Sequence, residues 1–360
     1  MRPKQMFSNL IFLAGRNALK KIRSGGLNPD DVKAIAGAAG GPKWLILGQL
    51  DRVMFSSWFS GRQQPLFLAG SSSGAWRFAA ACRSDPIAAL DRFEDAYIHQ
   101  FYHRRPTPQE VSIQGRRILN SFMGVKGSNE VLKHPYLRLN IMCVRCHGLT
   151  ASHSEIPQMI GFMIAALLNA ISRNGLNLFF ERTQFSDSRD IAPFFTTDDL
   201  PVQRVALTAQ NVMPAMMSSG SIPIIMSGVC DIPRAPKGVY RDGGITDYHV
   251  APSFDEEDGI VLLPHYTDRI IPGWLDKKLT WRKPDSNCTD NLLLVAPSPE
   301  FISKLPLQKI PDRTDFKRFQ GRDNERLDYW NKAVAMSRYL ADDFMEAVLS
   351  GKIRERVRPL

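Results

Sequence analysis

The sequence predicts an α/β fold in which helices cover both faces of a mostly parallel sheet. Short apolar runs recur between turn residues, several of them lack the strict alternation of a half-exposed strand, and helical patterns lie between them. At 360 residues with 44% hydrophobic content, the chain can also bury a large core. The runs span residues 32–36, 66–69, 137–144, 204–207, 260–263 and 292–295.

Residues 1–31 are predicted to form a basic helical segment ahead of the main domain, which we place at residues 32–300. Arg2 and Lys4 resemble the positive start of a signal peptide, but the apolar stretch at 10–14 is too short and basic residues follow it at once. We therefore expect a cytoplasmic protein, with a basic helix on a membrane surface as the alternative for this segment.

Two stretches inside the main domain are predicted to be helical insertions, near residues 86–130 and 155–175. In the first, Pro106 and Pro108 interrupt the helical pattern, which is typical of a cap beside the sheet. In the second, residues 156–172 carry no charge and fall just short of a membrane span. This segment predicts a core or cap helix, with an apolar surface facing lipid or an acyl chain as the alternative.

The last segment, residues 301–360, is predicted to be a charged helical extension. It ends in an amphipathic helix over residues 329–349, and Gly351 provides a plausible stop. We expect this helix to pack one face on the domain and to expose the other to solvent.

The formal charge of +10 and a pI near 9.4 suit a nucleic acid, an anionic membrane or an acidic substrate. No zinc-finger or RNA-binding motif is found, so we expect no nucleic-acid partner. The five cysteines are odd in number and too sparse for a disulfide scaffold, which favours a reducing compartment. Residues 143–147 match the Cys-x-x-Cys-His spacing of haem attachment, but with no export signal and no second ligand pair we expect neither haem nor zinc.

The pentapeptide from Gly70 to Gly74 matches Gly-x-Ser-x-Gly, with Ser72 at its centre. It follows the apolar run 66–69 and precedes a stretch of small and aromatic residues at 75–81. A serine on such a strand-to-helix turn has its hydroxyl lifted clear of the backbone. The motif alone is weak, and its context makes Ser72 a candidate nucleophile.

Acyl transfer through serine places negative charge on the carbonyl oxygen, which then needs preorganised N–H donors. A glycine-rich turn at residues 37–43 follows the first predicted buried strand. Pro42 has no N–H, so the candidate donors are the amides of Gly40, Gly41 and Ser73. Lys43 is either a positive charge near the site or a surface lysine at a helix start.

The nucleophile also needs a base. Asp242 precedes Gly243 and Gly244 at the end of a short β-like run, although an Asp-Gly-Gly sequence is more often only a turn. The alternative is a Ser-Asp-His triad of the α/β-hydrolase type that uses His249 or His265, both of which follow Asp242 in the chain.

Four ordered motifs across residues 32–265 together resemble those of the patatin-like phospholipases. The resemblance implies a three-layer α/β/α sandwich and a Ser-Asp dyad that works without histidine. The family commonly has glycines where this chain has Ala39 and Trp44. Together with Pro42, these residues motivate a second alternative, a catalytically weak lipid-binding module. The motifs are Gly40-Gly41-x-Lys43, Gly70-Ser71-Ser72-Ser73-Gly74, Ser219-Gly220-Ser221-Ile222-Pro223 and Asp242-Gly243-Gly244.

Carried over to this chain, the resemblance implies a lipid acyl hydrolase of the phospholipase A or lysophospholipase type, acting in lipid metabolism. Ser72 would be the nucleophile, Asp242 its base, and Gly40 and Gly41 part of the oxyanion hole. The expected substrate is a phospholipid or another acyl lipid, met at the periphery of an anionic membrane, and no metal or organic cofactor is implied. Lys43, Gly70, Gly74, Gly243 and Gly244 complete the motifs.

Overall fold

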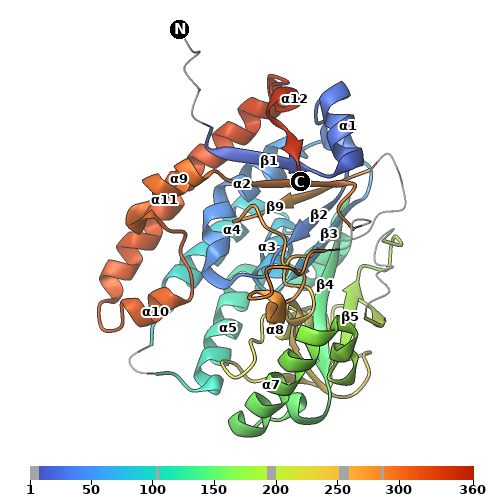
Figure 1. Ribbon diagram of the computed structural model, residues 1–360, viewed down its shortest axis with the longest axis vertical. Coiled ribbons are helices and arrows are strands. Elements are labelled where there is room, and N and C mark those ends of the chain that lie inside the picture. The colour runs from blue at the N-terminus through green and yellow to red at the C-terminus, as the bar shows by residue number, and fades with distance from the viewer. Residues whose placement is uncertain (1–7, 103–104, 193–199, 251–258, 285–287) are drawn as a thin grey trace.

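A computed structural model describes residues 8–102, 105–192, 200–250, 259–284 and 288–360. The described strands form one sheet in the order β11-β1-β10-β9-β2-β3-β4-β5-β6, with β8 pairing with β4 and β7 pairing with β8 (Figure 1). The strands are β1 Leu10–Ala14, β2 Val32–Gly37, β3 Leu66–Ser71, β4 Leu137–Cys146, β5 Phe180–Ser186, β6 Val202–Ala206, β7 Val229–Cys230, β8 Val239–Asp242, β9 Ile260–Pro264, β10 Leu292–Pro297 and β11 Arg358–Pro359.

The centre of the sheet is parallel, as the continuous apolar runs predict. Strands β10, β9, β2, β3 and β4 pair in parallel, whereas β1 with β10, β4 with β5 and β4 with β8 are antiparallel. Along β2, Ile35 packs into the core on one face while Ala34 and Ala36 pack into the core on the other. Both faces of the central strands are therefore buried, and the predicted α/β class with a mostly parallel sheet is confirmed.

Helices flank this sheet and cover one of its faces most thickly. Helix α3 packs against β2, β3 and β4, while α2, α4 and α11 form further layers around it (Figure 1). The helices are α1 Arg16–Gly25, α2 Gly48–Val53, α3 Ser73–Ala81, α4 Pro86–Ile98, α5 Pro108–Met123, α6 Gly127–Lys133, α7 Glu155–Ile171, α8 Val212–Ser219, α9 Pro299–Lys304, α10 Thr314–Arg318, α11 Asp323–Leu349 and α12 Ile353–Arg356.

The N-terminal segment of the chain differs from the sequence prediction, because part of it is a strand. Residues 10–14 form strand β1, although the sequence predicts a helical segment over residues 1–31. This stretch lies between β10 and β11, whose backbone groups satisfy its N–H and C=O groups on both sides. The division into segments at 31 and 300 stays a prediction, but strands from both outer segments join the same sheet.

The predicted insertions contain α4, α5 and α6 in the first stretch and α7 in the second. Among the residues that the structure describes, no helix is both long enough and apolar enough to cross a bilayer.

Candidate active site

Ser72 lies on a tight turn between β3 and α3. Its φ of 53° is in the left-handed region, which residues other than glycine rarely adopt. The glycines on either side permit this turn: a Cβ on Gly70 would lie 2.6 Å from the N atom of Ala75, and one on Gly74 would lie 2.3 Å from the carbonyl oxygen of Gly37. The Gly-x-Ser-x-Gly pattern thus has a steric cause here, because no other residue type fits these two positions.

Asp242 ends β8 and reaches the serine hydroxyl. The Oγ of Ser72 donates a hydrogen bond to Oδ2 of Asp242 at 2.8 Å, and Oδ1 accepts one from the N–H of Gly244 at 2.8 Å. Ser72 is 4% exposed and Asp242 is 6% exposed. A Cβ on Gly243 would meet the carbonyl oxygen of Met142 at 2.0 Å, so a glycine is required for β8 to turn away directly after the carboxylate.

The last residue of α8 and the segment that follows it hold both partners in place. The N–H of Ser72 donates to Oγ of Ser219 at 2.9 Å, and that hydroxyl donates to the carbonyl oxygen of Met142 at 2.6 Å. The N–H of Asp242 donates to the carbonyl oxygen of Ser221 at 3.0 Å. The Ser219-Gly220-Ser221-Ile222-Pro223 motif therefore connects the turn of Ser72 to the strand of Asp242 through hydrogen bonds.

Backbone amides suited to an oxyanion lie beside Ser72. Gly41 is the first residue of a 3₁₀ turn over Gly41–Leu47, and Ser73 is the first residue of α3. The first N–H groups of a helix have no acceptor within that helix, and both residues line one cavity together with Ser72. Gly40 directly precedes Gly41 as the N-cap residue of that turn. Of the three predicted donor residues, Gly41 and Ser73 line the cavity together with Ser72, whereas Gly40 is adjacent to Gly41 in the chain.

The glycine-rich loop is buttressed by Tyr266, a residue that the sequence did not single out. The hydroxyl of Tyr266 donates to the carbonyl oxygen of Ala39 at 2.5 Å, and the N–H of Ala39 donates to the carbonyl oxygen of Tyr248 at 2.8 Å. A Cβ on Gly40 would lie 2.7 Å from the ring of Tyr266. Ala39, which stands where the resembling family has a glycine, is consequently fixed by hydrogen bonds at both of its backbone polar groups.

The two candidate triad histidines have other partners. Nδ1 of His249 accepts from the N–H of Ile271 at 2.8 Å, so its Nε2 carries the proton and donates to the hydroxyl of Tyr266 at 3.0 Å. His265 bonds through Nδ1 to the backbone of Thr267, and burial lowers its pKa to about 3. Within the described residues, neither ring hydrogen-bonds to Ser72 or Asp242, so the triad alternative gains no geometric support.

The charge of the candidate base depends on nearby cations. Burial raises the pKa of Asp242, whereas Arg313, the N–H of Gly244, the Ser72 hydroxyl and Lys277 lower it. Burial, Arg313 and Lys43 lower the pKa of Lys277 to about 7. These cations favour the carboxylate form that a base requires.

Both lysines lie over aromatic rings. Nζ of Lys277 lies 3.9 Å from the ring centroid of Tyr248, and Nζ of Lys43 lies 4.7 Å from that of Tyr266. Lys43, the last residue of the glycine-rich turn, thus lies against the tyrosine that contacts this turn.

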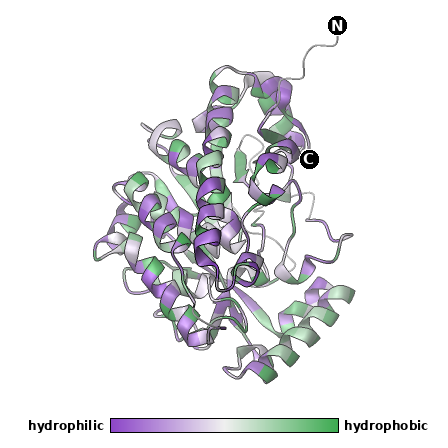
Figure 2. Ribbon diagram, turned by 90° about the vertical axis from the view of Figure 1, so that its left-hand side faces the viewer, coloured by the Kyte–Doolittle hydropathy of each residue, from purple (hydrophilic) through white to green (hydrophobic). Residues whose placement is uncertain are grey.

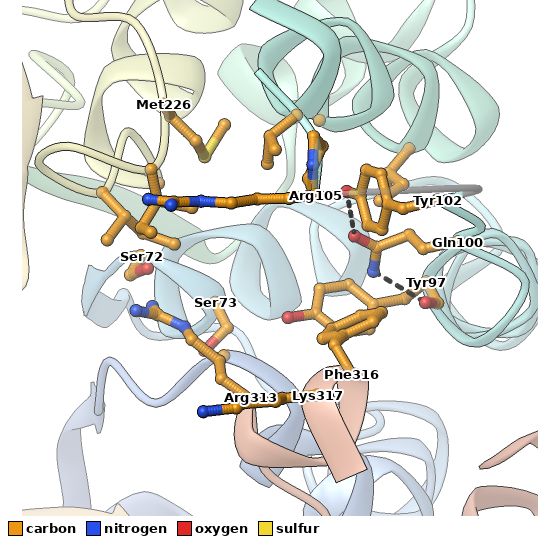
Figure 3. A pocket seen from close by; sticks show the side chains of 18 of the residues that line it. Ser72, Ser73, Tyr97, Gln100, Tyr102, Arg105, Met226, Arg313, Phe316 and Lys317 are labelled. Atoms are coloured by element: carbon orange, nitrogen blue, oxygen red, sulfur yellow. Dashed lines mark hydrogen bonds between the residues drawn. The ribbon is translucent and has the colours of Figure 1, made fainter. Parts of the chain in front are cut away.

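A cavity of about 620 Å³ opens at Ser72. Figure 3 shows Arg313 with its guanidinium directed toward Ser72, with Arg105 and Lys317 also around the cavity. The walls are mainly apolar, so the site combines a serine bonded to a buried carboxylate with room for a hydrocarbon chain. The apolar and aromatic lining residues include Trp76, Tyr97, Tyr102, Val111, Ile118, Ile222, Ile225, Met226 and Phe316.

The two cysteines of the Cys-x-x-Cys-His stretch do not face one another. Cys143 and Cys146 lie on opposite faces of β4, in separate core clusters. Burial raises the pKa of each thiol to about 12, so both remain protonated at neutral pH. Across the described part of the chain, no three His, Cys, Asp or Glu side chains gather closely enough to hold a metal ion.

No family model matches this chain, and none of the curated proteins matches it in sequence. Among solved structures, it is similar to the crystal structure of VipD from Legionella pneumophila, with a TM-score of 0.31 and 12% identity. The similarity covers 94% of this chain and 71% of the VipD chain. Because a likeness at this level does not show a family, the function must be inferred from the geometry around Ser72.

Proposed function

We propose that the chain is a serine lipid acyl hydrolase of the patatin-like type, with phospholipase A or lysophospholipase activity. One observation carries the proposal: the Oγ of Ser72, on a strained turn, lies 2.8 Å from a buried carboxylate at an apolar cavity. Strain at a buried polar residue is typical of a functional site, because a purely structural serine has no need of it.

The reaction begins when Asp242 accepts the proton of Ser72 and Oγ attacks the ester carbonyl carbon. The developing oxyanion accepts hydrogen bonds from the N–H groups of Gly41 and Ser73, with Gly40 in the same loop. The intermediate then collapses, the C–O bond to the alcohol breaks, and the alcohol leaves with the proton from Asp242. Asp242 next deprotonates a water that attacks the acyl-enzyme, which releases the fatty acid and restores the Ser72 hydroxyl.

The cavity supports a phospholipid as the substrate. Its apolar walls suit an acyl chain, and Arg105, Arg313 and Lys317 place positive charge around it. Guanidinium groups bind phosphate oxygens through paired hydrogen bonds, so a phosphate-bearing head group fits this arrangement. The net charge of +10 would attract the protein from the cytoplasm to an anionic membrane, where such substrates lie.

Trp44, whose presence in the glycine-rich motif motivates the binding-module alternative, does not line the cavity. It packs in the core, with its ring stacked on Phe93 at a centroid distance of 4.1 Å. Trp44 therefore does not block the approach of an ester carbonyl to Ser72.

A fluorophosphonate probe tests the proposal directly, since it labels a serine only when that serine is activated. We expect labelling of the native chain, none of the Ser72→Ala variant, and Ser72-dependent release of fatty acid from phospholipid vesicles. Ser73→Ala is the matched control, because it removes a neighbouring hydroxyl and keeps the amide. Absence of Ser72-dependent labelling together with absence of ester turnover would favour the binding module.

A further inference from the structure

Helix α7 presents a continuous apolar face to solvent, and its opposite side, which carries Phe162 and Ala165 as well as polar residues, packs on the protein. Ile156, Leu167 and Ile171 are 69%, 63% and 84% exposed, and they lie on the same face as other exposed residues. Figure 2 shows this helix at the lower right as predominantly hydrophobic along its length. The complete set of large exposed residues on the helix is Ile156, Met159, Ile160, Met163, Ile164, Leu167 and Ile171, which we call the α7 face.

The buried side of α7 is held by Phe162, whose ring packs near those of Phe180 and Trp274, and by polar and small residues. Oε1 of Gln158 accepts a hydrogen bond from the N–H of Ile224 at 2.5 Å, and Nδ2 of Asn169 donates to Oδ1 of Asp276 at 2.7 Å. A Cβ on Gly161 would lie 2.8 Å from the Cβ of Leu149. The helix is therefore fixed in this orientation by buried hydrogen bonds and close packing, and a rotation that hid the apolar side would break them.

Helix α11 in the same molecule follows the ordinary rule. It buries Trp330, Leu340 and Phe344 against the core, and Tyr339 and Leu349 are among the few large apolar residues that it exposes. A scattered exposed apolar residue is normal, but a continuous apolar face of a helix marks an interaction surface. The α7 face thus needs a partner that the α11 surface does not.

The N-terminal end of α7 lies next to residues that line the cavity. Arg105, which lines the cavity and has a 91% exposed side chain, lies 3.8 Å from Glu155 at the start of α7. Ile225, another lining residue, is half exposed and follows Ile224, whose N–H bonds to Gln158. The apolar surface, a cation and the cavity entrance therefore lie together on one side of the molecule.

We propose that the α7 face inserts into the acyl region of an anionic lipid bilayer and brings the cavity to the membrane surface. The choice of a bilayer as the occupant rests on the proposed function, since a lipid substrate must pass from the membrane to Ser72. It also rests on charge, because Arg105 and Lys317 beside the apolar entrance complement anionic head groups. A helix that lies in the interface with its apolar side in the lipid is the arrangement expected of such a face.

The test uses the Ser72→Ala chain, which leaves vesicles intact, in flotation assays with phosphatidylcholine vesicles with and without one quarter phosphatidylglycerol. We expect binding that increases with phosphatidylglycerol. The double variant Met163→Glu/Leu167→Glu should weaken binding at least about 10-fold, equivalent to about 1.4 kcal/mol. The matched control Tyr339→Glu/Leu349→Glu adds the same two charges to exposed apolar positions of α11 and should bind within about 2-fold of the parent.

Two outcomes would overturn this inference. One is vesicle binding by the α7 variant as tight as that of the parent. The other is a dimer of the parent, found by sedimentation, that the α7 variant converts to a monomer, because a second copy would then cover the face. Vesicle binding that depends on α7 without any Ser72-dependent ester hydrolysis would instead support the docking surface and refute the proposed function.

Discussion

Two walls of the cavity differ in the part of the chain that forms them and in the groups that they bring to the site. One is built at the ends of sheet strands, where short backbone turns place Ser72 and Gly41 at the cavity and Asp242 bonds directly to the Ser72 hydroxyl. The other comes from the C-terminal segment, which places Arg313 and Phe316 against the same space. Within the described residues, no hydrogen bond joins Arg313 to Ser72 or Asp242, so its effect on them is that of a nearby charge.

This difference predicts two sizes of effect. A group that exchanges a proton with the reacting atoms contributes several powers of ten to a rate. A partly exposed cation that acts through space contributes less, because water screens it. Variants in the sheet wall should therefore abolish chemistry, whereas variants in the C-terminal wall should tune it.

The largest effect is expected from Asp242→Asn. The amide cannot accept the proton of Ser72, so kcat/KM for a phospholipid should fall about 10³-fold, within the range usual for loss of a general base. Steady-state kinetics on a fluorogenic acyl lipid measures this, and a thermal unfolding midpoint close to that of the native chain shows that the fold is kept.

Variants of the two buried histidines provide the opposing control. His265→Asn and His249→Gln should retain most of the turnover number, because both rings bond elsewhere. If His265→Asn abolishes turnover while Asp242→Asn does not, the dyad is wrong and a triad must replace it.

An intermediate effect is expected from Arg313→Gln. Removal of this charge favours the protonated form of Asp242 and takes a cation from the entrance, so kcat/KM at neutral pH should fall about 10-fold, below the loss of about 10²–10³-fold typical of an oxyanion-hole donor. Arg318→Gln is the matched control, since Arg318 is exposed on α10 outside the cavity lining. Equal losses in both variants would show that the effect is not specific to the site.

The fold was predictable where one local pattern dominates. The runs at 32–36 and 260–263 lie in strands buried on both faces, and such strands are continuously apolar. Strand β1 was not predictable, because residues 10–14 lie among basic residues and their partners are some 280 and 345 positions away. The orientation of α7 was also not predictable, because an apolar sequence pattern predicts a buried helix unless the hydrogen bonds on its buried side are known.

The site was predictable to the extent that glycines mark it. The turns at Ser72 and Asp242 exclude side chains, so they leave a sequence signature. Arg313 and Tyr266 leave none, because an arginine in a charged segment and a tyrosine after a strand are ordinary until the tertiary structure brings them to the loop.

The smallest effect is expected from Lys277→Gln, and it should appear as a change in pH dependence. Asp242 must be ionised to act as a base, so kcat/KM falls as the pH drops through its pKa, which burial raises. Lys277 has a pKa of about 7, so below pH 7 it is charged and favours the carboxylate. Its replacement by glutamine should move the acidic limb of the pH profile to higher pH, by less than Arg313→Gln does, and should leave the rate above pH 8 nearly unchanged because the native lysine is already neutral there. A uniform loss at all pH values would show that Lys277 acts by packing on Tyr248 rather than by charge.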